Sequence, residues 1–208
     1  MKCYTYYIII ALLTLLTSCG DTEYEYSGYP AYFIFENNAG RSAALASAMN
    51  AQSPGIFCRI TLSSAASGEH GNRLLFNFAS NQGLSDVSAL SAIDEQRTIQ
   101  LGVYNMTGII VGFGNLDNPP TFYAYDSQCP NCYKNTNLPR FSLSMNTDGT
   151  AECGNCHRKY DMNNNGLVVN AGDSVVVDGE KIEVQPGDRL IRYHASTTGP
   201  QGVLSVTN

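Results

Sequence analysis

Four cysteines arranged in two CxxC pairs constrain this 208-residue chain more than any other feature. Cys129 and Cys132 form the first pair, and Cys153 and Cys156 form the second. A tight turn within each pair lets two thiolates face one ion, and two such turns complete a tetrahedron. The Asp148-Gly149 turn between the pairs fits a hairpin that brings the two loops together. We therefore expect a metal site at the tips of two adjacent loops.

The residue types leave the identity of the metal open. Four thiolates suit zinc, a single iron or a two-iron cluster. Disulfides are the competing interpretation, because an exported chain meets an oxidising compartment. A redox-active CxxC normally opens a helix after a strand, however, and we expect no helix after either pair. We therefore favour one zinc or iron ion, with a [2Fe–2S] cluster as the alternative.

The first residues indicate export and lipid attachment. Lys2 gives a short positive start, and the apolar run over residues 7–16 is too short for a permanent membrane span. The run ends in Leu16-Thr17-Ser18-Cys19, which resembles the bacterial lipobox. We expect a signal peptide over residues 1–18, lipid on Cys19, a tether over residues 19–28, and a location in the cell envelope at a membrane.

Charge and motifs exclude some function classes. The net charge is −6 with only 12 Lys plus Arg, whereas nucleic-acid binding needs a concentrated basic surface. The chain contains neither a nucleophile-elbow pattern nor an HExxH helix. We therefore expect neither nucleic-acid binding nor enzymatic catalysis, and a redox or surface protein partner stays open.

Residues 29–208 have a mainly β pattern. Short runs of β-branched and aromatic residues alternate with turn residues, which is typical of an antiparallel sandwich or small barrel. Residues 42–50 form the single helix that we expect, with Ser42 as its cap. Residues 63–71 look like a polar loop, residues 81–91 have no clear period, and residues 95–103 look like a strand. Cys58 lies inside an expected strand and fits a buried free thiol.

The second half of the chain resembles Rieske domains. The motif CGNCHRKYD over residues 153–161, the Asn165-Gly166 turn and the segment 187–193 are similar to the second half of that family. Residues 122–130 resemble the strand that enters the first Rieske loop. The resemblance covers residues 102–208, and residues 29–101 would be a family-specific β-rich extension. It implies a Rieske-like lipoprotein of the type common in Bacteroidetes.

The chain departs from that family at its ligands. Asn131 stands at the first Rieske histidine position, and Cys156 stands at the second. The resemblance therefore implies a site of four cysteines in place of two cysteines and two histidines. His157 follows Cys156 directly, and we expect it at most to donate a hydrogen bond beside the ligands.

Three hypotheses for function follow. The first is a lipid-anchored domain whose metal clamps two loops. A segment exported without a twin-arginine signal would acquire its metal outside the cytoplasm, which favours zinc or a single iron. The second is an electron carrier of the cell envelope with a [2Fe–2S] cluster at the same cysteines. The third is a surface interaction module with disulfides in place of metal.

Overall fold

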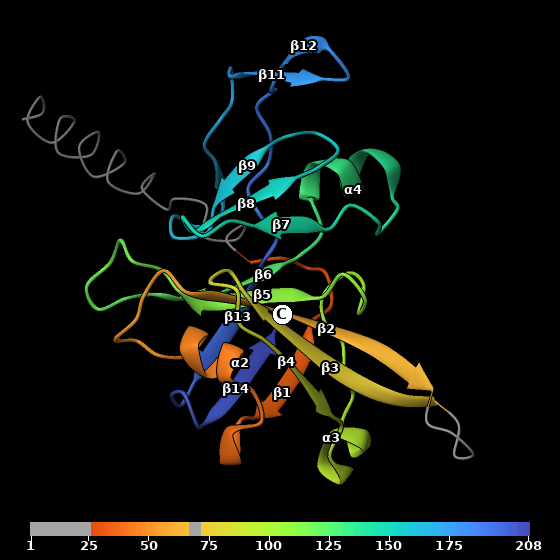
Figure 1. The fold of residues 1–208 in the computed structure, drawn as a ribbon, viewed down its shortest axis with the longest axis vertical. Helices are drawn as coiled ribbons and strands as arrows, with labels where there is room; N and C mark the ends of the chain where they lie inside the picture. The colour runs from red at the N-terminus through yellow and green to blue at the C-terminus, as the bar shows by residue number, and fades with distance from the viewer. Residues whose placement is uncertain (1–25, 67–71) are drawn as a thin grey trace, which may run out of the picture.

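A computed structural model describes residues 26–66 and 72–208, and these residues form a mainly β fold (Figure 1). Every strand pairing is antiparallel. The larger sheet contains β1 (Tyr32–Glu36), β2 (Phe57–Ala66), β3 (Asn72–Ser80), β4 (Ser85–Ala89), β5 (Ile109–Phe113), β6 (Phe122–Asp126), β13 (Arg192–Thr197) and β14 (Val203–Thr207). The mainly β class predicted from the sequence is confirmed.

The larger sheet curls into a half-barrel. Its strand order is β1-β14-β13-β6-β5-β2-β3-β4, so five strands separate β1 from β3. Even so, the ring centroids of Phe33 in β1 and Phe76 in β3 lie 5.4 Å apart. Phe35 and Phe78 approach to 5.1 Å in the same way. The sheet therefore encloses an aromatic core instead of facing a second sheet of equal size. Strands β1–β4 come from residues 29–101 and the other four from residues 102–208.

The period of two along each strand gives this sheet two apolar faces. In β5, Ile109 and Val111 point into the half-barrel, whereas Ile110 belongs to a second cluster on the outer face. Tyr123 and Tyr125 of β6 also face outward. A strand that is apolar on both faces must be covered on both sides, and the cysteine-bearing segment covers the outer side.

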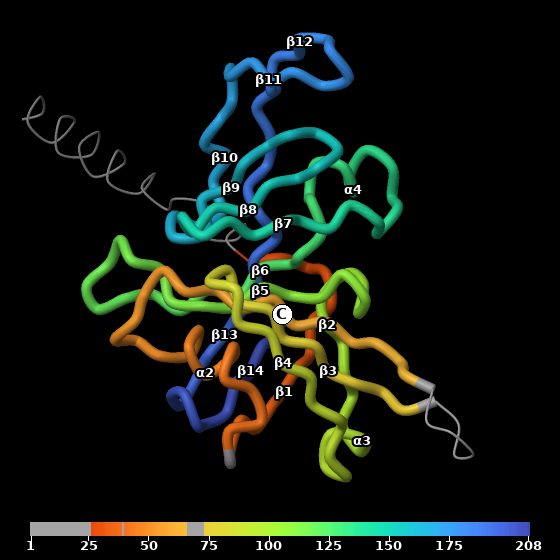
Figure 2. Tube along the Cα trace, viewed as in Figure 1, coloured from red at the N-terminus to blue at the C-terminus, as the bar shows by residue number. Residues whose placement is uncertain are grey.

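This covering unit, here called the small lobe, spans residues 127–190. It contains α4 (Pro130–Thr136), β7 (Leu143–Met145), β8 (Thr150–Cys153), β9 (Lys159–Asp161), β10 (Leu167–Val168), β11 (Ser174–Val177) and β12 (Glu180–Glu183). Strands β7 to β10 form one sheet in chain order, and β11 and β12 form a separate hairpin. The hairpin lies at the end of the molecule farthest from the larger sheet (Figure 2). The Tyr125 hydroxyl donates to the Met162 carbonyl at 3.0 Å, which joins the lobe to β6.

The helix predicted near residue 42 is confirmed and closes one opening of the half-barrel. Helix α2 spans Ala43–Ala48, and the Ser42 side chain accepts from the Leu45 N–H, as an N-cap should. Ala44, Leu45 and Ala48 are buried against the aromatic core. Small residues on this face let the short helix approach the sheet closely.

Two expectations about local structure were wrong, and one stretch left without an assignment is a strand. Helix α3 (Ala92–Gln96) overlaps the start of the strand expected over residues 95–103, because Ser91 and Asp94 form a capping box. Strand β4 occupies the stretch without a clear period, where it pairs with β3. The polar loop expected from Ser63 begins later, since β2 continues to Ala66; the rest of that loop, residues 67–71, lies outside the described residues.

No helix among the described residues is long and apolar enough to cross a membrane. The predicted signal peptide and the lipid site at Cys19 lie outside the described residues. Export and lipidation therefore stay predictions from the sequence.

Candidate metal centre

The first cysteine pair lies at the start of a short helix. Cys129 is the N-cap of α4, Pro130 follows at the first helical position, and Cys132 lies in the first turn. The expectation that no helix follows either pair was wrong, because Pro130 favours a helix start at this point. A CxxC at a strand–helix junction is also the setting of redox-active thiols. Cys129 is fully buried, however, and a reactive thiol of that kind needs access to its substrate.

The second pair lies in a tight turn at the end of β8. Cys153 is the last residue of that strand and is fully buried, whereas Cys156 is partly exposed. The His157 N–H donates to the Cys153 carbonyl at 2.9 Å, and the Cys153 N–H donates to the Arg158 carbonyl at 3.1 Å. His157 has a φ of 57°, a left-handed conformation that turns the chain back toward β9. Its backbone N–H and carbonyl both form hydrogen bonds, and a role for its ring stays a prediction.

The four sulfur atoms converge on one point. All four lie within 4.8 Å of one another. The distances from Cys129 Sγ to Cys156 Sγ and from Cys132 Sγ to Cys153 Sγ are both 3.7 Å. Zinc–sulfur bonds of about 2.3 Å in a tetrahedron place the sulfurs about 3.8 Å apart. The two sulfurs of a disulfide lie about 2.05 Å apart, so no disulfide joins these four cysteines. The alternative interpretation of the two pairs as disulfides was therefore wrong.

The thiols influence one another strongly because they are crowded together. Burial raises the pKa of Cys132 to about 11. Hydrogen bonding with Cys129 and Cys156 holds the pKa of Cys153 far above its usual range. Hydrogen bonds from Cys129 and Cys153, aided by Arg158, hold the pKa of Cys156 well below its usual range. A bound cation would favour the thiolate form of all four cysteines.

Polar side chains around the sulfurs orient two of them. The Asn155 amide donates to Cys132 Sγ at 3.3 Å. The Tyr160 hydroxyl lies 3.2 Å from Cys129 Sγ and receives a hydrogen bond from the Asn131 amide at 3.0 Å. Because that amide proton occupies the phenol oxygen, the Tyr160 proton is left to point at sulfur. Sequence reasoning missed these roles, since only the fold brings Tyr160 beside the first pair.

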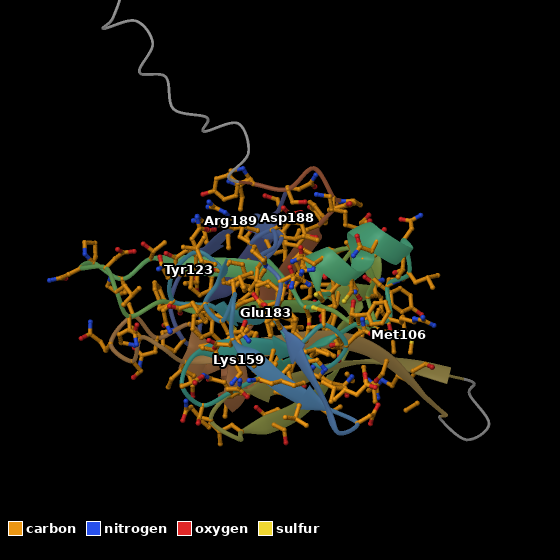
Figure 3. The ribbon with its side chains drawn as sticks, turned by 90° about the horizontal axis from the view of Figure 1, so that it is seen from above. Met106, Tyr123, Lys159, Glu183, Asp188 and Arg189 are labelled. Atoms are coloured by element: carbon orange, nitrogen blue, oxygen red, sulfur yellow. The ribbon has the colours of Figure 1, made fainter. Side chains whose placement is uncertain are left out.

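A loop from the far side of the small lobe closes over the first pair. The Asn131 amide donates to the Asp188 carbonyl at 3.1 Å and accepts from the Asp188 N–H at 3.0 Å. Arg158 donates to the carbonyls of Gln185 and Pro186 at 2.9 and 3.0 Å. A Cβ atom at Gly187 would lie 2.5 Å from Asn131 Oδ1, so only glycine permits this approach. Figure 3 looks onto this end of the molecule, with Asp188, Arg189 and Lys159 labelled.

A buried carboxylate supports the loop before Cys129. Asp126 is fully buried and accepts from the Val103 N–H, the Gln128 N–H and the Tyr193 hydroxyl at 2.7, 2.7 and 2.8 Å. Burial raises its pKa from 3.8 to about 6, against the opposing effect of these donors. Asp126 therefore links the larger sheet to the first cysteine loop, although burial of its charged form is unfavourable.

Asp126 should make stability depend on pH. The pKa of Asp126 is higher in the folded protein than in the unfolded chain. Its stabilising contribution to the unfolding free energy is therefore complete below about pH 4 and is lost as the pH rises through 6. We expect the unfolding free energy of the wild type to fall by about 1–2 kcal/mol relative to Asp126→Asn between pH 5 and pH 7. Urea unfolding of both proteins at several pH values measures this difference. A difference that stays constant with pH would show that Asp126 is ionised throughout.

The isolated cysteine behaves as expected. Cys58 in β2 is a fully buried free thiol, and burial holds its pKa above its usual range. It packs with Ile60 and Phe78 in the half-barrel core, on the face opposite the metal centre.

The geometry thus supplies a centre of four cysteines that could hold one metal ion. Similarity to known proteins does not identify the chain. Comparison with protein-family models, with curated proteins and with solved structures finds no match.

Proposed function

We propose that Cys129, Cys132, Cys153 and Cys156 hold one metal ion, zinc or a single iron, which clamps the two cysteine loops of the small lobe. The observation that carries this proposal is the mutual distance of the four sulfurs, all within 4.8 Å. In a two-iron cluster, two cysteines bind each iron, so sulfurs on different irons lie farther apart than sulfurs that share one ion. Four mutually close sulfurs therefore favour a single ion over a [2Fe–2S] cluster.

A clamping role fits the sparse core of the small lobe. Outside the cysteines, its fully buried apolar residues are few, namely Leu143, Ala151, Tyr160, Met162 and Leu190. Four further members of the second cluster come from the outer face of the larger sheet: Phe57, Ile110, Tyr123 and Tyr125. A structural ion supplies folding free energy where an apolar core is too small, and it joins α4 to the turn after β8.

The domain would act at a membrane surface. The Leu16–Cys19 pattern supports a lipid on Cys19, and Tyr26, the first described residue, follows seven positions later. A fully extended segment of that length spans about 25 Å. We infer a metal-bearing lipoprotein of the cell envelope, related to Rieske-like proteins in its loop motifs and without catalytic activity of its own.

One observation favours a second function, that of an electron carrier. Cys156 is partly exposed, so an iron at this centre would lie close to the surface. Hydrogen bonds to sulfur and solvent exposure are two of the features that set the potential of iron–sulfur sites. Exchange with a redox partner protein would then take place at the Cys156 side.

Metal content and the visible spectrum of the full chain, purified in detergent without added metal, test the proposal. One colourless zinc per chain would support the structural role. One iron per chain without sulfide, with a reversible couple, would support the electron carrier. Two irons with sulfide would overturn the single-ion centre, and oxidised cysteines without metal would overturn metal binding altogether.

Tyr160 should contribute to metal affinity through its hydroxyl. Replacing Tyr160 with Phe removes the hydrogen bond to Cys129 Sγ and keeps the buried ring. Loss of such a partner typically lowers metal affinity by about 10- to 100-fold. Competition with a chromogenic chelator measures the change. The control is Tyr125→Phe, because Tyr125 is equally buried but donates to the Met162 carbonyl; equal losses in both variants would contradict the prediction.

A further inference from the structure

A second polar site lies outside the metal centre, on the outer face of β13 and β14. It is a cavity of about 190 Å³ next to Tyr26. The register pairs His194 with Thr207 and Ser196 with Ser205, which puts these four side chains on one face as two neighbouring pairs. The residues between them, Ala195 and Val206, pack against the half-barrel core. The polar face is therefore built on two rigid strands.

Arg192 forms the end of this cavity. It is 8% exposed, and its guanidinium carbon lies 4.9 Å from the Tyr26 ring centroid and 4.8 Å from that of Tyr123. It also donates to Asn165 Oδ1 at 3.0 Å. Stacking between two aromatic rings fixes the plane of a guanidinium and directs its N–H groups sideways. Tyr123 is labelled in Figure 3.

The chemistry of the lining is that of hydrogen-bond donors. Within the described part of the chain, the hydroxyls of Ser196, Ser205 and Thr207 have no protein hydrogen-bond partner, and no acidic residue lines the cavity. His194 stacks on Tyr26 at 3.7 Å and adds a ring nitrogen. Three hydroxyl donors beside a fixed guanidinium match an oxyanion better than a cation or an apolar group.

We propose that this cavity binds a phosphate-type oxyanion, held by Arg192 and by the hydroxyls of Ser196, Ser205 and Thr207. The Ser27 N–H donates to the Arg192 carbonyl at 2.8 Å, so the site lies where the chain enters the domain from the predicted tether. The oxyanion is either a free phosphate compound or the phosphate of a lipid headgroup. Its binding does not depend on the metal centre.

Two titrations of the full chain test this proposal by NMR. The first adds inorganic phosphate to the protein in detergent, and the second compares nanodiscs of phosphatidylglycerol with nanodiscs of phosphatidylcholine. Shifts of the amides of Ser196, Ser205 and Thr207 with phosphate would identify a free anion as ligand. Shifts only with phosphatidylglycerol would identify a headgroup. Absence of shifts in both titrations would overturn the proposal.

Variants separate this site from general charge effects. The double variant Ser196→Val/Ser205→Val keeps Arg192 and suits strand positions, and it should weaken binding about tenfold or more through the loss of two hydrogen bonds. Ser144→Val, on an exposed position of β7, is the control and should bind as the wild type does. Arg192→Gln should abolish binding. Unchanged affinity in the double variant would overturn the site even if Arg192→Gln fails to fold.

Discussion

Cys153→Ser is expected to abolish metal binding and to unfold the small lobe while the half-barrel keeps its structure. Cys153 is fully buried at the end of β8, and its sulfur lies 3.7 Å from that of Cys132. Serine offers a poorer ligand and leaves a hydroxyl in a site built for sulfur. The ion contributes several kcal/mol or more to such a unit, since structural zinc binds with about 10–16 kcal/mol in small domains. The metal content should therefore fall from one ion per chain to nearly none.

Limited proteolysis with mass spectrometry locates the loss. New cleavage should fall within residues 127–190, and the strands of the half-barrel should stay protected, because their aromatic core lies on the other face of the larger sheet. Removal of the ion from the wild type by a strong chelator should produce the same pattern.

Cys58→Ala is the matched control for this experiment. It removes another fully buried cysteine, but one that lies in the half-barrel core, on the other face of the larger sheet from the four converging sulfurs. It should keep one ion per chain and lose about 1–2 kcal/mol from the smaller core side chain. A Cys153→Ser protein that keeps its metal and its protease resistance would show that Cys153 is no ligand.

The sequence was sufficient to predict that the four cysteines form one site, because the geometry that brings their sulfurs together is set by neighbouring residues. Two residues between the cysteines of each pair fix how the thiols point, and a turn at Asp148-Gly149 brings the pairs together. The structure has that hairpin between β7 and β8. The partners of the sulfurs were not predictable in the same way. Tyr160 is 31 residues from Cys129, and only the pairing of β8 with β9 brings it close.

The arrangement of the strands was harder to predict from the sequence than the mainly β fold class. Alternating apolar residues predicted strands at most of the correct places, but they do not say which strands pair. The contact of β1 with β14 joins residues about 170 positions apart, and no short-range pattern encodes it. Two helices were also missed. One depends on the capping box of Ser91 and Asp94, and the other on Pro130 after the N-cap Cys129, so both signals were single residues rather than a period.

Phe35→Ala tests the half-barrel independently of the metal and should cost about 3–5 kcal/mol of unfolding free energy. Phe35 is fully buried where β1 meets β3 across the curled sheet. Its ring centroid lies 5.5 Å from that of Phe76 and 5.1 Å from that of Phe78. The guanidinium carbon of Arg41 lies 4.3 Å from the same centroid. Loss of the ring therefore leaves a cavity and removes an aromatic support from Arg41.

Arg41 limits how far the structure can relax into the cavity left by Phe35→Ala. Its Nη2 atom forms an ion pair of 2.8 Å with the buried carboxylate of Asp94, which caps α3. A collapse of the neighbouring rings into the cavity would shift Arg41 and weaken that pair, so relaxation is limited and the cost should fall near the upper end of the range.

Chemical denaturation measures the loss, and metal content distinguishes it from damage to the small lobe. The folded Phe35→Ala protein should still hold one ion per chain, because its cavity lies on the opposite face of the larger sheet from the cysteines. Val176→Ala in β11 is the control; this side chain is 73% exposed, so stability should change by less than about 0.5 kcal/mol. A loss below about 1 kcal/mol for Phe35→Ala would mean that β1 does not close the half-barrel against β3.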